Sequence, residues 1–350
     1  MASANPPAPE RDSWPHERPD AAPRVYHLQL PPDAFGLRFD QALARSLPDY
    51  SRSRLRAWID DGRVTVDGST ANARYKVRGG EAVVVRAKPD PQENAYAPQA
   101  IALRIVHEDD VLLVIDKPAG LVVHPGSGNW EGTLLNALLH HAPALAAVPR
   151  AGIVHRLDKD TSGLLVVAKT LTAQTLLVRQ LQARTVHREY LALVNGDVHR
   201  DGSVDAPIGR HPTRRTTMAV VATGKPARTH YRVVERLHLA TLLECRLETG
   251  RTHQIRVHLA SIGHPLIGDP AYGRKRPLGP LGAARRPPRG SERLGSGPAA
   301  LTIAFTRQAL HAARLGLAHP LTGASLQWSA PLPDDFSALL ERLRAQSTSY

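Results

Sequence analysis

The chain has 350 residues, of which 42% are hydrophobic and 22% charged, a balance typical of globular proteins and not of disordered or fibrous ones. It is long enough for two domains and for a core that needs neither disulfides nor metals. The 45 basic residues exceed the 32 acidic ones, and only seven of them are Lys. This Arg-rich net charge of +13 favours a polyanionic partner, although a bias of the genome toward Arg codons would also explain it.

The single cysteine, Cys245, excludes an internal disulfide and any multi-cysteine metal site. No apolar run approaches the ~18 residues of a membrane helix, so no membrane partner is expected. The first 25 residues lack the apolar stretch of a secretory signal. These features together predict a cytoplasmic protein.

Composition divides the chain into segments. Residues 1–24, with six prolines, are expected to form a disordered tail. A small module is predicted over residues 36–86, a Pro-rich linker over 87–100 and a larger domain over 101–343. Within the larger domain, residues 274–293 carry seven basic residues and one Glu, which gives +6, and many Pro and Gly. We expect this segment to be a flexible basic insertion.

The small module begins with two predicted helices. Apolar residues recur at helical spacing, namely Phe39, Leu43 and Leu47 in the first helix and Leu55, Trp58 and Ile59 in the second. Ser51 or Ser53 can cap the second helix, and Gly62 can end it. A strand at Val64 and Val66, an Asp67-Gly68 turn and a strand over residues 81–86 follow.

The second of these helices carries Arg52, Arg54 and Arg56, which could form a solvated face or contact phosphates. Two helices joined by a short turn and followed by a basic hairpin resemble the S4 RNA-binding module, also called the αL motif. The string RFDQALARSLPDYSRSRLRAWIDDGRVTVDG carries this resemblance. The module is therefore expected to bind RNA.

The larger domain mixes strands and helices without strict alternation. Strands are predicted at Leu112–Ile115, Leu121–His124, Leu164–Ala168, Tyr190–Val194 and Thr241–Leu247, and helices at Thr133–His140 and Thr172–Ala183. The predicted fold class is therefore α+β with a mixed sheet.

Several common catalytic motifs are missing from the sequence. It contains no phosphate-binding P-loop, no GxSxG elbow and no HExxH zinc motif. Gly126, Gly128 and Gly132 do not have the spacing of a dinucleotide-binding loop. We therefore predict neither a cofactor nor a metal.

The densest polar segment is GIVHRLDKDTSGLLVVAKT, residues 152–170. Apolar, strand-like runs flank its polar centre. An ordinary Asp/Ser/Thr turn would explain this pattern. Alternatively, Asp158 is a carboxylate held between two rigid strands with cations beside it, which could act as a nucleophile.

A second polar segment, LETGRTHQIRVHLASIGHPLIGDPAYG, covers residues 247–273. Thr252 is predicted to cap a helix that ends at Gly263 and buries Ile255, Leu259 and Ile262. Arg251 would then lie just before the helix and Arg256 within it. Both could be surface residues, or one could face a carboxylate or phosphate near the helix N-terminus.

Five segments in order resemble the pseudouridine synthases of the RluA and RluD type. They are DKPAGLVVHPG (116–126), HRLDKDTSGLLVVAKT (155–170), HREYLALVNG (187–196), GRTHQIRVHLASIGHPLIGDPAYG (250–273) and RQALHAARLGLAHPLTG (307–323). The resemblance extends over residues 36–340 and implies an isomerase. It also implies the catalytic fold of that family, a mixed, largely antiparallel sheet flanked by helices and loops.

The resemblance assigns roles to individual residues. Asp158 matches the nucleophile, which could attack C1′, add to C6 or remove a sugar proton. Arg251 matches the arginine that pairs with it, and Tyr190 the tyrosine that stacks on uracil and helps to remove the C5 proton. Arg156 matches the residue that fills the gap left by the flipped uridine. The full set expected to contact substrate or RNA is Arg156, His155, Thr161, Arg256, Arg52, Arg54 and Arg56.

The resemblance also implies a substrate in a stem-loop of 23S ribosomal RNA or the large ribosomal subunit precursor, with no cofactor and no obligate protein partner. The alternatives are a synthase that acts on tRNA or another RNA, a non-catalytic ribosome-assembly protein, and an N-glycosidase that releases free uracil.

Overall fold

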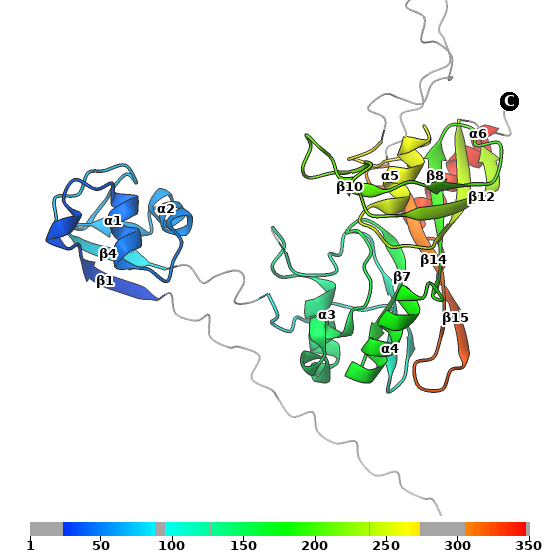
Figure 1. Cartoon of the computed structure of the whole chain (residues 1–350), viewed down its shortest axis with the longest axis horizontal. Coiled ribbons are helices and arrows are strands. Elements are labelled where there is room, and N and C mark those ends of the chain that lie inside the picture. Colours follow the sequence, from blue (N-terminus) through cyan, green and yellow to red (C-terminus); the bar gives the residue numbers. More distant parts are fainter. Residues whose placement is uncertain (1–23, 88–94, 127, 238, 274–304, 348–350) are drawn as a thin grey trace, which may run out of the picture. The chain divides into compact units, whose positions relative to one another are not determined.

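The computed structural model describes residues 24–87, 95–126, 128–237, 239–273 and 305–347. The predicted tail (1–24, except its last residue) and the basic insertion (274–293) lie outside these ranges. The chain forms two compact units that divide between residues 93 and 94 (Figure 1). Each unit is described by itself. Within the described residues, no helix is long and apolar enough to cross a membrane.

The N-terminal unit contains two α-helices and a four-stranded antiparallel sheet in the order β1-β4-β2-β3. Its elements are β1 (Val25–Gln29), η1 (Pro32–Ala34), α1 (Phe39–Ser46), α2 (Arg52–Asp60), β2 (Val64–Val66), β3 (Ser69–Thr70) and β4 (Ala82–Arg86). Because β1 pairs with β4, the folded unit begins before residue 36, where the sequence placed its start. Only Tyr26 and Leu28 alternate in β1, which is too weak a pattern to predict a strand.

Local signals in this unit are confirmed. The Ser51 hydroxyl accepts a hydrogen bond from the Arg54 amide and caps α2, whose residues Leu55, Trp58 and Ile59 are buried. Gly62 ends the helix with φ 69°, in the left-handed conformation that favours glycine. The apolar faces of α1 and α2 pack on the sheet and form one core.

The C-terminal unit is built on a nine-stranded sheet in the order β5-β6-β7-β14-β8-β13-β12-β9, with β15 paired to β14. The strands are β5 (Ile105–Glu108), β6 (Leu112–Lys117), β7 (Ser162–Ala168), β8 (His187–Asn195), β9 (Gly202–Asp205), β12 (Arg228–Leu237), β13 (Ala240–Leu247), β14 (Leu310–Ala318) and β15 (Ser325–Ser329). A separate ribbon pairs β10 (Ile208–Arg210) with β11 (Met218–Val220). Strands β7 and β14 run parallel, whereas the other paired strands of the described chain are antiparallel, so the predicted α+β class with a mixed, largely antiparallel sheet is confirmed.

Helices cover both faces of this sheet (Figure 1). They are α3 (Leu134–His141), α4 (Leu171–Gln182), α5 (Gln254–Ser261) and α6 (Asp334–Ser347), with short 3-10 turns η2 (Pro143–Ala147) and η3 (Pro149–Gly152). Side chains of β7 alternate between two cores: Leu165 packs with α3 and α5, and Leu164 with α4. Burial on both faces makes β7 apolar throughout, which explains why the sequence identified it so clearly.

One predicted strand and one predicted domain boundary differ from the structure. Residues 121–124 do not form a strand; only Val122 makes a single bridge, to Thr133. The C-terminal part of the predicted 87–100 linker belongs to the second unit, because the buried Asn136 amide donates hydrogen bonds to the Ala95 and Ala97 carbonyls. Short apolar or Pro-rich stretches of this kind take their structure from distant partners.

Candidate active site

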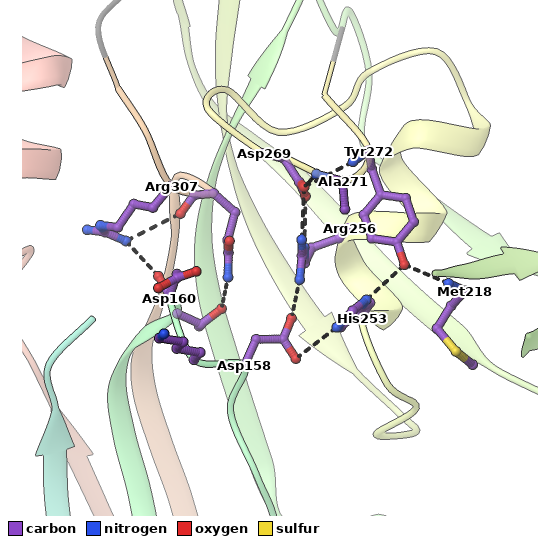
Figure 2. Close-up of polar contacts among 12 residues, drawn as sticks. Asp158, Asp160, Met218, His253, Arg256, Asp269, Ala271, Tyr272 and Arg307 are labelled. Carbon is purple, nitrogen blue, oxygen red and sulfur yellow. Dashed lines mark hydrogen bonds and ion pairs between the residues drawn. The ribbon is translucent and has the colours of Figure 1, made fainter. Parts of the chain in front are cut away.

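Asp158 lies in a loop that leads into β7. The predicted strand on its N-terminal side is wrong, since the chain there leaves the 3-10 turn η3 and makes only one bridge, at Ile153. Distant side chains hold the loop instead. Arg307 donates to the Asp160 carbonyl at 3.2 Å, and Gln308 donates to the Thr161 hydroxyl at 3.1 Å (Figure 2 shows the Arg307 contact).

Lys117 gives this loop a third support. Its ammonium group is buried at the end of β6 and donates to the carbonyls of Pro118, Leu121 and Lys159 at 2.7, 3.0 and 2.9 Å. Burial lowers the pKa of Lys117 to about 7. The sequence does not mark this residue, because a lysine at the end of a strand has no pattern that indicates burial.

The Asp158 carboxylate is paired with Arg256 of α5 (Figure 2). Arg256 Nη1 lies 2.9 Å from Asp158 Oδ2. The same guanidinium makes two hydrogen bonds to Asp269, at 2.8 and 2.9 Å. Burial opposes the charge on Arg256, but the two carboxylates outweigh it and raise its pKa. Arg256 is therefore a fixed cation that orients Asp158.

Asp269 holds Arg256 on the side of the guanidinium away from Asp158. Its side chain is fully buried, and it accepts hydrogen bonds from the Ala271 and Tyr272 amides as well as from Arg256. Burial acts to raise the pKa of Asp269, but these hydrogen bonds and the Arg256 charge lower it by more, so the net shift is downward. Asp269 stands in the segment GDPAYG, where the sequence marked a resemblance but no role.

Arg251 does not occupy the position predicted for it. Its exposed side chain donates from Nε to the Pro226 carbonyl at 3.2 Å, and Arg256 holds Asp158 instead. The predicted pairing of Arg251 with Asp158 is therefore wrong in this structure. Arg256 stands three residues before buried Leu259, so helical spacing could have identified it as the inward-facing arginine.

The start of α5 also differs from the prediction. Thr252 is not its cap; the helix begins at Gln254, and His253 precedes it in a left-handed conformation. The Gln254 side chain accepts from the Arg251 amide at 3.0 Å, which holds the segment that precedes the helix. Ile255 and Leu259 are buried as predicted, whereas Ile262 is 38% exposed because it terminates the helix. The predicted end at Gly263 is confirmed by its φ of 90°.

A cavity of about 610 Å³ opens in front of Asp158. It brings together the predicted residues of the larger domain, namely Asp158, Tyr190, Arg251, Arg156, His155, Thr161 and Arg256. Tyr190 comes from β8, between β13 and β14, and burial raises its pKa. The volume lies within the ~300–1,000 Å³ typical of small-molecule pockets, so one nucleoside can be accommodated.

The three predicted contacts near Asp158 differ in exposure. His155 accepts a hydrogen bond from the Val166 amide at 3.2 Å, and burial lowers its pKa to about 3, so it is neutral. Thr161 is buried and bonded to Gln308. Both residues support the loop through these bonds. Arg156 is exposed on the cavity wall.

The arginines of α2 have partners within their own unit. Arg52 makes two hydrogen bonds to buried Asp40, at 3.0 and 2.8 Å. The Arg54 guanidinium lies 5.3 Å from the Tyr50 ring and 5.1 Å from the Trp58 ring. Arg56 lies 3.7 Å from Asp60. Arg52 and Arg56 are exposed and Arg54 is partly exposed, so phosphate contacts are compatible with these pairings.

No cluster of three or more His, Cys, Asp or Glu side chains that could hold a metal occurs in the part of the chain that the structure describes. The groups at the site are thus a paired carboxylate, a buried phenol and several cations.

Comparison with known proteins identifies the family. The family model for RNA pseudouridylate synthases matches residues 111–261, and the S4 domain model matches residues 37–83. A ribosomal large subunit pseudouridine synthase D from Nitrosomonas europaea is 58% identical over 317 residues, which are 91% of this chain and 87% of the relative. The chain belongs to the pseudouridine synthase family. The predicted resemblance to this family, the S4 module and the isomerase activity are confirmed.

Other relatives agree. The ribosomal large subunit pseudouridine synthase D of Escherichia coli strain K12 is 54% identical over 89% of this chain and 91% of its own. Among solved structures, human RNA pseudouridylate synthase domain containing 4 is 28% identical, covers 69% of this chain and 93% of its own, and has a TM-score of 0.51. The matched region of this pseudouridine synthase includes Asp158, Tyr190 and both arginines of the GRTHQIR segment.

Proposed function

We propose that this pseudouridine synthase isomerises uridine in a stem-loop of 23S ribosomal RNA, with Asp158 as the nucleophile. The observation that carries the proposal is the Asp158 carboxylate, held at 2.9 Å by buried Arg256 on the wall of a cavity that also contains Tyr190. The substrate class is supported by relatives whose names specify the large ribosomal subunit. A cytoplasmic location belongs to the same proposal.

The reaction breaks the N1–C1′ bond of uridine, turns the uracil within the cavity and joins C5 to C1′. It ends when C5 loses its proton and N1 gains one, either the same proton or one exchanged with solvent, so atoms balance without water consumption or redox change. Attack on C1′ and addition to C6 both require an oriented carboxylate, and Arg256 holds one oxygen of Asp158 at 2.9 Å. Removal of a sugar proton would use the same carboxylate as a base.

Tyr190 is proposed to stack on the uracil. Because burial raises its pKa, the neutral phenol is the resting form, and an aromatic face is its main contribution to binding. If Tyr190 removed the C5 proton, its phenol would first have to lose its own proton once the substrate is bound. Tyr190→Phe separates the two, since it keeps the ring and removes the hydroxyl.

RNA positioning is assigned to cations outside the reacting centre. Exposed Arg156 would fill the gap left by the flipped uridine, because a guanidinium can stack on bases and bond phosphates. Arg52, Arg54 and Arg56 would contribute phosphate contacts from the S4 module. The insertion at 274–293, with its +6 charge, would add salt-sensitive affinity without selecting the uridine.

Mapping pseudouridines in ribosomal RNA from a strain that lacks this protein tests the substrate. We expect one cluster of 23S positions to lose the modification, with restoration by the normal gene and not by an Asp158→Asn variant. Unchanged 23S RNA with losses in tRNA would support the alternative of a tRNA synthase. Release of free uracil by the purified enzyme would support an N-glycosidase.

A further inference from the structure

The second oxygen of the Asp158 carboxylate faces His253. While Oδ2 is bonded to Arg256, Oδ1 lies 3.9 Å from His253 Nε2 (Figure 2). The other ring nitrogen of His253, Nδ1, lies 2.8 Å from the Tyr272 hydroxyl, which in turn lies 2.8 Å from the Met218 amide nitrogen. A chain of hydrogen bonds therefore begins at a backbone amide and ends beside Asp158.

The direction of these bonds favours one imidazole tautomer. A backbone amide can only donate, so the Tyr272 oxygen accepts from Met218, and its own proton is then available for donation to His253 Nδ1. Nδ1 is then the acceptor, and in a neutral imidazole the proton resides on Nε2. Nε2 is the atom that faces Asp158 Oδ1. The arrangement thus presents an N–H donor to the carboxylate.

The charged and titratable groups around His253 come from three segments. Burial lowers its pKa; Asp158 and Asp269 act to raise it, and Arg256 and Arg156 oppose them, with a net lowering. Tyr272 packs edge-on against the imidazole, with ring centroids 5.6 Å apart. The surroundings therefore favour a neutral ring beside the carboxylate.

The backbone of His253 is unusual in a way that supports a role for its side chain. It is the N-cap of α5 with φ 56° and ψ 24°, a left-handed conformation that is unfavourable for a residue with a side chain. An N-cap side chain normally accepts a hydrogen bond from its own helix, but that of His253 does not. The imidazole instead reaches Tyr272 and Asp158, so the strained backbone directs it to the site.

We propose that His253 is a positioning residue whose neutral Nε2–H hydrogen-bonds Asp158 Oδ1 when RNA occupies the cavity, with Tyr272 fixing the tautomer. The proposal rests on the proposed role of Asp158. A contraction of about 1 Å brings the pair to hydrogen-bonding distance. Arg256 on one oxygen and His253 on the other then fix the rotation of the carboxylate. A neutral donor achieves this without passing a proton to the nucleophile.

Two substitutions at His253 separate positioning from folding. His253→Gly removes the donor and suits a left-handed backbone, whereas His253→Gln retains a side-chain N–H but keeps the strain. We expect His253→Gly to lower kcat by roughly tenfold or more with KM within about twofold, the pattern of an interaction specific to the transition state. His253→Gln should restore part of kcat while being no more stable than His253→Gly.

Tyr272→Phe tests the tautomer. It keeps the ring that lies 5.1 Å from the Arg256 guanidinium and removes only the hydroxyl. Without that donor the imidazole can place its proton on Nδ1 and turn a lone pair toward Asp158. We expect kcat to fall several-fold with KM little changed.

Leu239→Gly is a matched control for His253→Gly, because Leu239 is another left-handed residue (φ 63°), in the turn between β12 and β13. It should leave kcat unchanged.

The measurements are tritium release from a C5-tritiated 23S RNA transcript, for kcat and KM, and the thermal unfolding midpoint. The proposal is supported when activity ranks His253→Gln above His253→Gly while stability does not follow that order. Equal activity of both variants with the normal enzyme, or activity that follows the unfolding midpoint, overturns it. If Asp158→Asn also remains active, the proposed function has failed; if Asp158→Asn is inactive, only the role of His253 has failed.

Discussion

Each unit contains a triad of charged side chains, in which a central group contacts two groups of the opposite sign. The sign of the central group differs between the two units. In the N-terminal unit one carboxylate, Asp40, lies between Arg38 and Arg52; in the catalytic unit one guanidinium, Arg256, lies between Asp158 and Asp269. The central group is buried in both cases: the Asp40 side chain is 2% exposed and that of Arg256 6%. The outer groups of the two triads therefore carry opposite charges, positive in the first and negative in the second.

This difference matches the proposed tasks. The outer arginines of the first triad are 31% and 46% exposed, so a buried anion holds two cations toward solvent, where phosphates can reach them. In the second triad Asp269 is fully buried and Asp158 is 16% exposed, so a buried cation holds one carboxylate toward the cavity. The buried member organises the site, and the exposed member acts.

Removal of the buried cation should have the largest effect. Arg256→Met frees Asp158 and leaves Asp269 buried without its charge partner, which should cost ~3–5 kcal/mol of unfolding free energy. Activity should fall by at least ~10²–10³, as expected when a fixed electrostatic contact is lost. Denaturant unfolding and tritium release measure these effects. The double variant Arg256→Met with Asp269→Leu is the control, and should regain stability but not activity.

Removal of the buried anion should have a smaller effect, because Arg38 and Arg52 can turn to solvent. Asp40→Asn should destabilise the N-terminal unit by about 1–3 kcal/mol. Burial acts to raise the pKa of Asp40, but the hydrogen bonds from Arg38 and Arg52 lower it below its ordinary value of 3.8. A lowered folded-state pKa means that the stabilisation is present above the unfolded value and is lost as pH falls through the folded one.

Acid titration therefore separates Asp40 from other groups. The N-terminal unit should lose stability below about pH 4 in the normal protein, and this dependence should weaken in Asp40→Asn. Unfolding followed by Trp58 fluorescence as a function of pH would measure it, with Asp60→Asn as an exposed control. An unchanged acid dependence in the Asp40 variant would show that this triad does not stabilise the unit.

Arg251 offers a direct contrast with Arg256 on the same segment. Its side chain is exposed and bonded only to the Pro226 carbonyl among the contacts described, so Arg251→Ala should change stability by less than ~0.5 kcal/mol. We expect KM to rise roughly three- to tenfold, the equivalent of about 1 kcal/mol of binding, with kcat nearly unchanged. A loss of kcat as large as that of Arg256→Met would reinstate Arg251 as the catalytic partner.

The smallest effects concern the exposed arginines of α2. Arg56→Ala removes an exposed pair with Asp60 worth about 0.3–0.5 kcal/mol, so stability should barely change. If Arg56 contacts a phosphate, the slope of log affinity against log salt should decrease by about one. Arg52→Ala should reduce the slope similarly and also destabilise the unit, because it removes a partner of Asp40. Equal salt slopes in all three proteins would exclude α2 from the RNA interface.

Local patterns predicted the helices α1 to α4, the end of α5 and the candidate Asp158, because these depend on residues close in sequence. Ser51, Gly62 and the burial of Leu55 follow from neighbouring side chains alone. Tyr190 and Arg156 needed the family resemblance, since a strand tyrosine and a loop arginine have no distinctive local pattern. The cavity brings both together with Asp158.

The wrong predictions concern residues whose positions depend on contacts that are distant in sequence. The family resemblance suggested Arg251 as the Asp158 partner, whereas Arg256 holds Asp158. The start of α5 was also misplaced, since the helix begins one residue later than a Thr252 cap would place it. Lys117 and Asp269 were not recognised, since one depends on burial beside the Lys159 carbonyl and the other on the Arg256 guanidinium, and neither contact has a local pattern. Strand β1 was missed for the same reason: its pairing partner β4 lies more than 50 residues away.

The central claim is that Asp158 acts through its charge, and Asp158→Asn tests it most directly. The amide oxygen can still accept a hydrogen bond from Arg256, so fold and RNA affinity should persist while activity falls by ~10⁴ or more, as for loss of a covalent nucleophile. Asp160→Asn makes the same charge change two residues away and should retain most activity. Tritium release from C5-labelled RNA should therefore be abolished in the first variant and preserved in the second; near-normal release from Asp158→Asn would contradict the account.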